Sequence, residues 1–190
     1  SSGGLSIVGA SPQINDCTFV NCFAVGTSNF FGGGAYVATA SSGTTAPTFQ
    51  GCLFLNCYAS LQGGGIYAAT SSPGTGLLSL GALNCRFVNC VATSLSTNTQ
   101  GGGVMASIGT IQSNSVALSD CSFEGCAAST GGGLAVDGNS SFPSGGVTLS
   151  RCDFFENSST PGGLGAAARF NYINVTANGC RVSDNFAVTD

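Results

Sequence analysis

The sequence predicts an all-β fold, a parallel β-helix of about six coils that each hold 28–36 residues and three short strands. Three observations lead to this prediction. An eight-residue phrase returns at a regular interval, a glycine step stands before a short alternating segment, and no segment has the length and 3.6-residue periodicity of a helix. A propeller would need about 40 residues and four antiparallel strands per repeat, which these intervals do not provide.

The repeated phrase is Cys-x-Phe-x-x-Cys-x-Ala, and it first occupies residues 17–24. Successive copies begin 35, 33, 36, 31 and 28 residues apart, which is the period of a stacked array of coils. In the last two copies Asn157 and Asn185 replace the second Cys. The later copies occupy residues 52–59, 85–92, 121–128, 152–159 and 180–187.

The Phe of each copy is expected to point inward and to stack on the Phe of the neighbouring coil. Strands of successive coils lie about 4.8 Å apart, so residues at one place in the phrase should form a column. Burial of each ring should contribute roughly 1.5–3 kcal/mol, with a further gain from stacking. The expected aromatic ladder comprises Phe19, Phe54, Phe87, Phe123 and Phe154, with Val182 last.

A glycine step precedes a second strand in each coil, as in Gly32-Gly33-Gly34, with a degenerate version at Gly162-Gly163. We expect these glycines at bends that other residues cannot adopt. Period-two alternation after the step then places one residue of each strand inward. The expected inward column is Leu5, Ala35, Ile66, Val104, Leu134 and Leu164.

The chain is expected to form a single β-helix domain, residues 1–190, or a segment of a longer chain. Neither end has a recognisable cap, and an uncapped β-helix offers strand edges and apolar coil ends to other chains. The last coil is therefore expected to stack on the first coil of another copy, or to continue into more of the same chain, as an open fibre. The expected coils are approximately 1–31, 32–62, 63–100, 101–130, 131–160 and 161–190.

The composition argues against several kinds of partner. Only 6% of the residues are charged, there is no Lys or His, and the net charge is −4. Nucleic-acid binding needs clustered cations, and no apolar run approaches the roughly 20 residues of a membrane span. We therefore expect no nucleic-acid partner, no membrane span in this segment and no cofactor.

Ten cysteines predict an oxidising compartment and disulfides. Zinc sites favour Cys-x2-Cys spacing, often with His, so no metal is expected. Two pairings remain open: Cys17 with Cys22 inside a coil, or Cys17 with Cys52 between coils. The longer loop closed by the second pairing, and the retention of Cys in coils that lost its neighbour, favour columns. The cysteine ladder comprises Cys17, Cys22, Cys52, Cys57, Cys85, Cys90, Cys121, Cys126, Cys152 and Cys180.

The segment Phe154-Phe-Glu-Asn157 and the glycine steps at 33–35, 64–66 and 132–134 resemble known repeats. They are similar to the Phe-x-x-Asn and Gly-Gly-Ala-Ile motifs of the polymorphic outer membrane proteins, the chlamydial-type autotransporter adhesins. In the first four copies a Cys stands at the place of the motif Asn. The resemblance covers nearly the whole chain and implies a right-handed parallel β-helix of the pectin-lyase-like type on a cell surface.

Asparagines have two expected roles. Asn157 and Asn185 should hydrogen-bond the backbone of a corner, as asparagine ladders do. Asn139, Asn157 and Asn174 stand in N-glycosylation sequons, and Asn139, in an expected loop, is the favoured candidate.

Pectin-lyase-like folds include polysaccharide-active enzymes, whose chemistry needs paired carboxylates or a suitably placed cation. Here Asp120 and Asp153 are each expected to form an ion pair with Arg151 and Arg181, respectively, one coil away. We therefore expect no catalytic residue and no enzyme activity. An ice-binding face would need a regular array of Thr, whereas the outward column that begins at Thr18 is chemically mixed.

The expected function is that of an extracellular or cell-surface structural protein, a rod that serves as a filament subunit or a surface stalk. The alternative is an adhesin or carbohydrate-binding module that contacts glycans or a host surface. Exposed aromatic residues would then make the contacts. The candidates are Tyr36, Tyr67, Phe155 and Tyr172.

Overall fold

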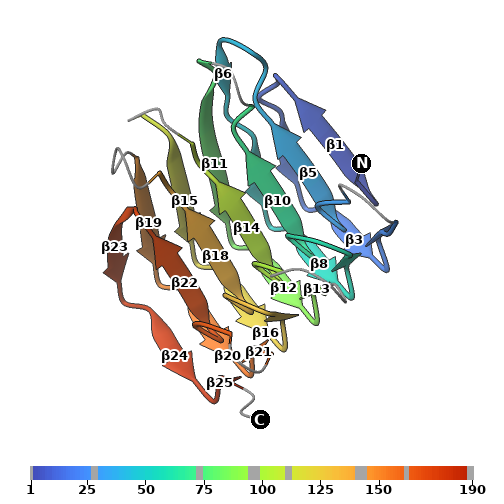
Figure 1. The fold of residues 1–190 in the computed structure, drawn as a ribbon, viewed down its shortest axis with the longest axis vertical. Helices are drawn as coiled ribbons and strands as arrows, with labels where there is room; N and C mark the ends of the chain where they lie inside the picture. The colour runs from blue at the N-terminus through green and yellow to red at the C-terminus, as the bar shows by residue number, and fades with distance from the viewer. Residues whose placement is uncertain are drawn as a thin grey trace.

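The computed structural model describes residues 2–26, 30–71, 75–93, 99–109, 113–139, 145–160 and 163–187. Its strands form four sheets in which all neighbours are parallel, and each turn of the chain adds one strand to each sheet. Figure 1 shows the strands of one sheet side by side, from β1 near the N-terminus to β22 near the C-terminus. The predicted all-β parallel solenoid is confirmed.

The first and second sheets have the following strands in spatial order. The first contains β1 (Leu5–Val8), β5 (Ala35–Ala38), β10 (Ile66–Ala69), β14 (Val104–Ser107), β18 (Leu134–Asp137) and β22 (Ala168–Asn171). The second contains β2 (Gln13–Asn15), β7 (Thr48–Gln50), β11 (Leu77–Leu83), β15 (Ser115–Ser119), β19 (Gly146–Ser150) and β23 (Asn174–Asn178), while the short β6 (Thr44–Thr45) also pairs with β11.

The third and fourth sheets are built from the repeated phrase. The third contains β3 (Thr18–Val20), β8 (Leu53–Leu55), β12 (Arg86–Val88), β16 (Ser122–Glu124), β20 (Asp153–Phe155) and β24 (Arg181–Ser183). The fourth contains β4 (Phe23–Ala24), β9 (Tyr58–Ala59), β13 (Val91–Ala92), β17 (Ala127–Ala128), β21 (Ser158–Ser159) and β25 (Phe186–Ala187). We call the strands of one turn a level, so β1–β4 form level one and β22–β25 form level six.

Each level has four strands, and level two has the short β6 in addition, so the expectation of three strands per coil is wrong in this detail. The reason is a bend in the middle of the phrase: Asn21, with φ of 51°, separates β3 from β4, and Asp16, with φ of 52°, stands just before Cys17. Asn, Asp and Gly tolerate this left-handed conformation best. The two corners recur at Asp16, Gly51, Asn84, Asp120, Arg151 and Gly179, and at Asn21, Asn56, Asn89, Gly125, Glu156 and Asp184.

The aromatic ladder is confirmed. Neighbouring rings along the ladder are stacked with centroids 4.6–4.8 Å apart and planes within 8° of parallel. The Phe87 side chain is fully buried. Val182 pairs in register with Phe154 and so continues the column on level six. Because every strand pairs in register, each column repeats one position of the phrase.

The inward column of the first sheet differs from the prediction at its last member. Leu134 pairs with Ala168, and Leu164 is 64% exposed. On level six the left-handed corner is made by Gly165, with φ of 64°, as it is by Gly131, with φ of 62°, on level five. The step of level six is therefore Gly165-Ala166-Ala167, and not Gly162-Gly163, of which Gly162 lies outside the described residues.

No helix in the part of the chain that the structure describes is long and apolar enough to cross a membrane.

Candidate functional site

The two open edges of the solenoid are the candidate functional surface. Large hydrophobic side chains that are exposed lie on levels one and six, with Leu83 as the exception among the described residues. An exposed apolar patch of this kind marks an interaction surface in a folded protein. The side chains are Val8, Val20, Phe23 and Val25 on level one, and Leu164, Tyr172, Val175, Val182 and Phe186 on level six.

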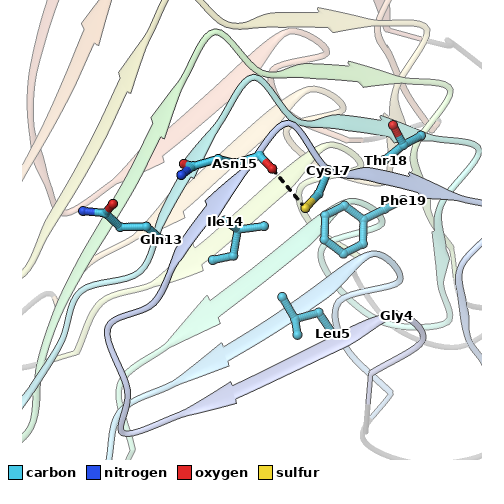
Figure 2. A pocket seen from close by; sticks show the side chains of 8 residues that line it. All are labelled: Gly4, Leu5, Gln13, Ile14, Asn15, Cys17, Thr18 and Phe19. Atoms are coloured by element: carbon cyan, nitrogen blue, oxygen red, sulfur yellow. Dashed lines mark hydrogen bonds between the residues drawn. The ribbon is translucent and has the colours of Figure 1, made fainter.

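At level one the interior of the solenoid opens into a hollow of about 780 Å³. Figure 2 shows Leu5, Ile14 and Phe19 directed toward this opening, and Thr18 directed away from it. Strands β1, β2 and β3 are the terminal members of their sheets, so one edge of each has no strand partner within the structure. The hollow thus combines an apolar floor with a rim of backbone groups. Its lining consists of Gly4, Leu5, Gln13, Ile14, Asn15, Cys17, Thr18 and Phe19.

The cysteines stand in two columns, as expected, and the backbone ladder passes through them. The amide of Arg86, for example, donates to the carbonyl oxygen of Cys52 at 2.9 Å. Each buried thiol of the first column donates to the carbonyl two residues before it and to one on the preceding level; Cys85 donates to Leu83 and Phe49, both at 3.4 Å. The first column is Cys17, Cys52, Cys85, Cys121, Cys152 and Cys180, and the second is Cys22, Cys57, Cys90 and Cys126.

The prediction of disulfides is wrong: all ten cysteines are free thiols. In-register strands separate stacked Cβ atoms by about 4.8 Å, whereas a disulfide needs roughly 3.5–4.5 Å between them. The pairing within a coil would have to cross the strand that holds the Phe. Burial raises the pKa of the Cys52 thiol, which keeps it protonated and able to donate. The argument for an oxidising compartment from paired cysteines therefore no longer applies.

In the second cysteine column, thiols give way to side-chain amides, but the acceptor on the preceding level is always the carbonyl oxygen of a ladder Phe. The thiols of Cys90 and Cys126 donate to the carbonyl oxygens of Phe54 and Phe87, respectively, both at 3.4 Å. One level later the amide of Asn157 donates to the equivalent carbonyl of Phe123 at 3.0 Å.

The two asparagines also accept backbone hydrogen bonds. The Oδ1 atom of Asn157 accepts from the amide of Cys126 at 3.0 Å, and that of Asn185 accepts from the amide of Asn157 at 2.9 Å. The expected asparagine ladder is confirmed by these contacts.

The structure separates the three candidate glycosylation sites. Asn157 is fully buried and its amide is hydrogen-bonded, so the expectation of a glycan there is wrong. Asn174 is exposed at the start of β23, and Asn139 is half-buried. Ser140 and Ser141 of the Asn139 sequon lie outside the described residues.

The glycine steps contain two kinds of glycine. On levels two to six the first residue of the step has a positive φ, such as 67° at Gly63, and serves as the expected bend. The second and third do not have a left-handed φ. A Cβ built on Gly64 would lie 2.4 Å from the carbonyl oxygen of Gly102, and one on Gly65 would lie 2.5 Å from that of Gly103. On its own level, a Cβ on Gly64 would also lie 2.5 Å from the amide nitrogen of Val91, and one on Gly65 would lie 2.8 Å from the ring of Phe87. These glycines are required because atoms of their own level and of the next level approach them closely, and the expectation of a bend at every glycine is wrong.

The arginines form ion pairs along the outside of the stack. The predicted pairs are present: Arg151 holds Asp120 at 2.6 Å, and Arg181 lies 3.5 Å from Asp153. The guanidinium of Arg151 lowers the pKa of the Asp120 carboxyl. Two further pairs, which the sequence reasoning missed, join Arg169 to Asp137 at 2.8 Å and Arg86 to Glu124 at 3.6 Å. All four arginines of the chain therefore have a carboxylate partner.

Two of the expected contact aromatics stack on each other. The rings of Tyr36 and Tyr67 have centroids 5.7 Å apart, and Phe31 covers Tyr67 with centroids 4.5 Å apart. Burial raises the pKa of Tyr67 to about 12. Sugar binding by stacking needs a free ring face, and Tyr67 already stacks on two neighbouring rings. Tyr172 is exposed and Phe155 half-buried.

Among the described residues, no three His, Cys, Asp or Glu side chains are arranged to hold a metal ion. The fold and its ladders define a parallel β-solenoid repeat protein. No protein-family model, curated protein or solved structure matches the chain.

Sequence reasoning placed the ladders correctly and missed the alanines of level six. Ala166 and Ala167 occupy the positions that glycines hold on the other levels, since Leu134 donates to the carbonyl oxygen of Ala167 at 3.0 Å as Val104 does to that of Gly133. Aligning the last repeat on Gly165 would have found them.

Proposed function

We propose that the protein is a structural β-solenoid, a segment of an extracellular rod that forms a surface stalk or filament and joins its neighbour by coil-on-coil stacking. The observation that supports this function is the open edge of level one, where the hollow and the unpaired strands face outward. The thiols of Cys17 and Cys22 have their local carbonyl partners there. A preceding coil would supply the second acceptor that Cys85 and Cys90 have.

The coil that fits this edge has a defined chemistry. On every internal join the level that comes first has glycines where the next level approaches. A Cβ built on Gly33, for example, would lie 2.4 Å from the carbonyl oxygen of Gly64. The partner of level one is therefore a coil of the same repeat type with two glycines at its step. Such a coil would place apolar side chains over Leu5 and Phe19.

The extracellular location is supported by two features of the chain. The repeats resemble those of the polymorphic outer membrane proteins, and Asn174 presents an exposed sequon. With 6% charged residues, hydroxyl and amide groups provide most of the polar groups. In a eukaryotic secretory host, Asn174 should gain a glycan, measured as a mass shift, whereas Asn157 should not.

Imaging of native material, with the chain marked by an antibody, tests the structural role. Rods that contain the chain in line with their axis, and fibre diffraction with a spacing of about 4.8 Å along that axis, are expected. Dispersed single particles would contradict the proposal. A glycan array separates the adhesin alternative, because a structural rod should bind none of the glycans, and Tyr172→Ala should reduce any binding made by an exposed ring.

A further inference from the structure

The two edges of the solenoid differ in the residues of the glycine step. On levels one to five the second residue of the step is glycine, and a Cβ built on it would lie 2.4–2.5 Å from a carbonyl oxygen of the next level. A Cβ on the third residue would lie 2.4–2.7 Å from the next carbonyl oxygen. Real Cβ atoms do not approach within 3.0 Å of such atoms. The contacts run from Gly3, Gly33, Gly64, Gly102 and Gly132, and from Gly4, Gly34, Gly65, Gly103 and Gly133.

Level six has alanine at both positions. The amide of Gly133 donates to the carbonyl oxygen of Ala166 at 3.2 Å, as the amide of Gly103 donates to that of Gly132 at 3.2 Å. The step is therefore in the same register on both levels. The two alanines lie on the last level that the structure describes.

The rest of level six leaves room for the Ala167 methyl group. A Cβ on Gly103 would lie 2.6 Å from the ring of Phe123, because the Phe of each level packs against the third residue of the step. On level six Val182 replaces the Phe, which removes the ring edge that the Ala167 methyl would meet. The change from Gly to Ala and the change from Phe to Val are thus matched within one level.

We infer that level six is a stop for coil stacking: its alanines prevent another coil from pairing in register on the C-terminal edge. This inference rests on the proposed rod and adds a direction to it. A coil placed there in the geometry of the internal joins would bring its carbonyl oxygens within 2.4–2.7 Å of the Ala166 and Ala167 methyl groups. The head-to-tail fibre expected from the sequence is then blocked at this edge.

The decisive variant is Ala166→Gly/Ala167→Gly in the full chain. Sedimentation velocity and electron microscopy should find head-to-tail polymers for the variant and none for the wild type at the same concentration. Ala177→Gly, on an exposed strand of the same level, is the matched control and should behave as the wild type. Phe23→Asp added to the double variant should abolish the polymers, because each joint needs the edge of level one.

A mixing experiment uses the wild type as a chain terminator. Its level-one edge can join the free end of a growing polymer, after which its own level six offers no further joint. Wild-type chain added to the double variant should shorten the polymers in proportion to its amount. The single variant Phe23→Asp, which keeps both alanines, should leave the length of the polymers unchanged.

An independent test places the same methyl groups inside the stack. Gly132→Ala/Gly133→Ala should separate level six from level five, so that hydrogen exchange at β22–β25 becomes faster while β1–β14 stay protected. If exchange is unchanged, the steric argument is wrong.

The two proposals fail in different ways. Head-to-tail polymers of the wild type, or a double variant that does not polymerise, would overturn the stop and leave the structural role in place. Single particles in the native material would instead contradict the structural role.

Discussion

The side-chain amide of Asn157 donates to the carbonyl oxygen of Phe123 at 3.0 Å, at a place where a thiol donates on the levels before it. A thiol and a primary amide thus serve one position of a repeat, because the corner needs a small inward donor. The amide does more, since Oδ1 of Asn157 also accepts the amide of Cys126.

Asn157→Ala should lower the free energy of unfolding by about 2–4 kcal/mol, because a buried carbonyl and a buried amide each lose their partner. Asn157→Cys should lose less, since the thiol can still donate to Phe123. Urea denaturation of both variants measures the difference. Equal losses for Ala and Cys would show that the thiol and amide donors are not equivalent.

Phe87→Ala should cost about 3–5 kcal/mol through the cavity it leaves in the ring stack. Phe87 stacks on both Phe54 and Phe123 at 4.8 Å, so two contacts are lost at once. Phe155→Ala, on the outward face of β20, is the matched control and should cost much less. Denaturant midpoints decide the outcome, and similar losses at both positions would contradict the ladder as the source of stability.

Alkylation under native, non-reducing conditions should modify Cys17 first, because it is exposed, and Cys22 and Cys180 more slowly, because they are half-buried. The other seven thiols are buried and should react only after unfolding. Mass spectrometry of peptides reports each site. Peptides linked through sulfur in the oxidised protein, or a melting temperature that falls with added reductant, would show that disulfides form after all.

The phenol of Tyr67 should ionise at a higher pH than an exposed tyrosine. Burial raises its pKa to about 12 from a usual value of 10, so the folded state holds this proton more tightly than the unfolded state. The contribution of the Tyr67 phenol to the free energy of unfolding is fully present below pH 10 and is lost as the pH rises toward 12. Absorbance at 295 nm should show a late tyrosinate step that Tyr67→Phe removes and Tyr172→Phe retains.

The sequence by itself determined the periodic features of this protein. In-register stacking at a fixed spacing requires the same kind of residue at the same place on every level. The Phe ladder, the two cysteine columns and the pairs of Arg151 and Arg181 could therefore be predicted from repeat spacing alone. The left-handed corners before Cys17 and Cys22 also had a signal, in Asp16 and Asn21, although three strands per coil were expected.

Only the tertiary structure decided features that depend on distances between levels. The sequence shows ten cysteines in columns. The spacing between strands is too large for stacked cysteines to form a disulfide unless the backbone moves. Asn157 matches a sequon, yet its burial assigns it to the ladder. The sequence suggested that Gly64 and Gly65 form bends, whereas their role follows from the close approach of atoms on their own level and of carbonyl oxygens on the next level. The distance to the next level is also what gives Ala166 and Ala167 their meaning on level six.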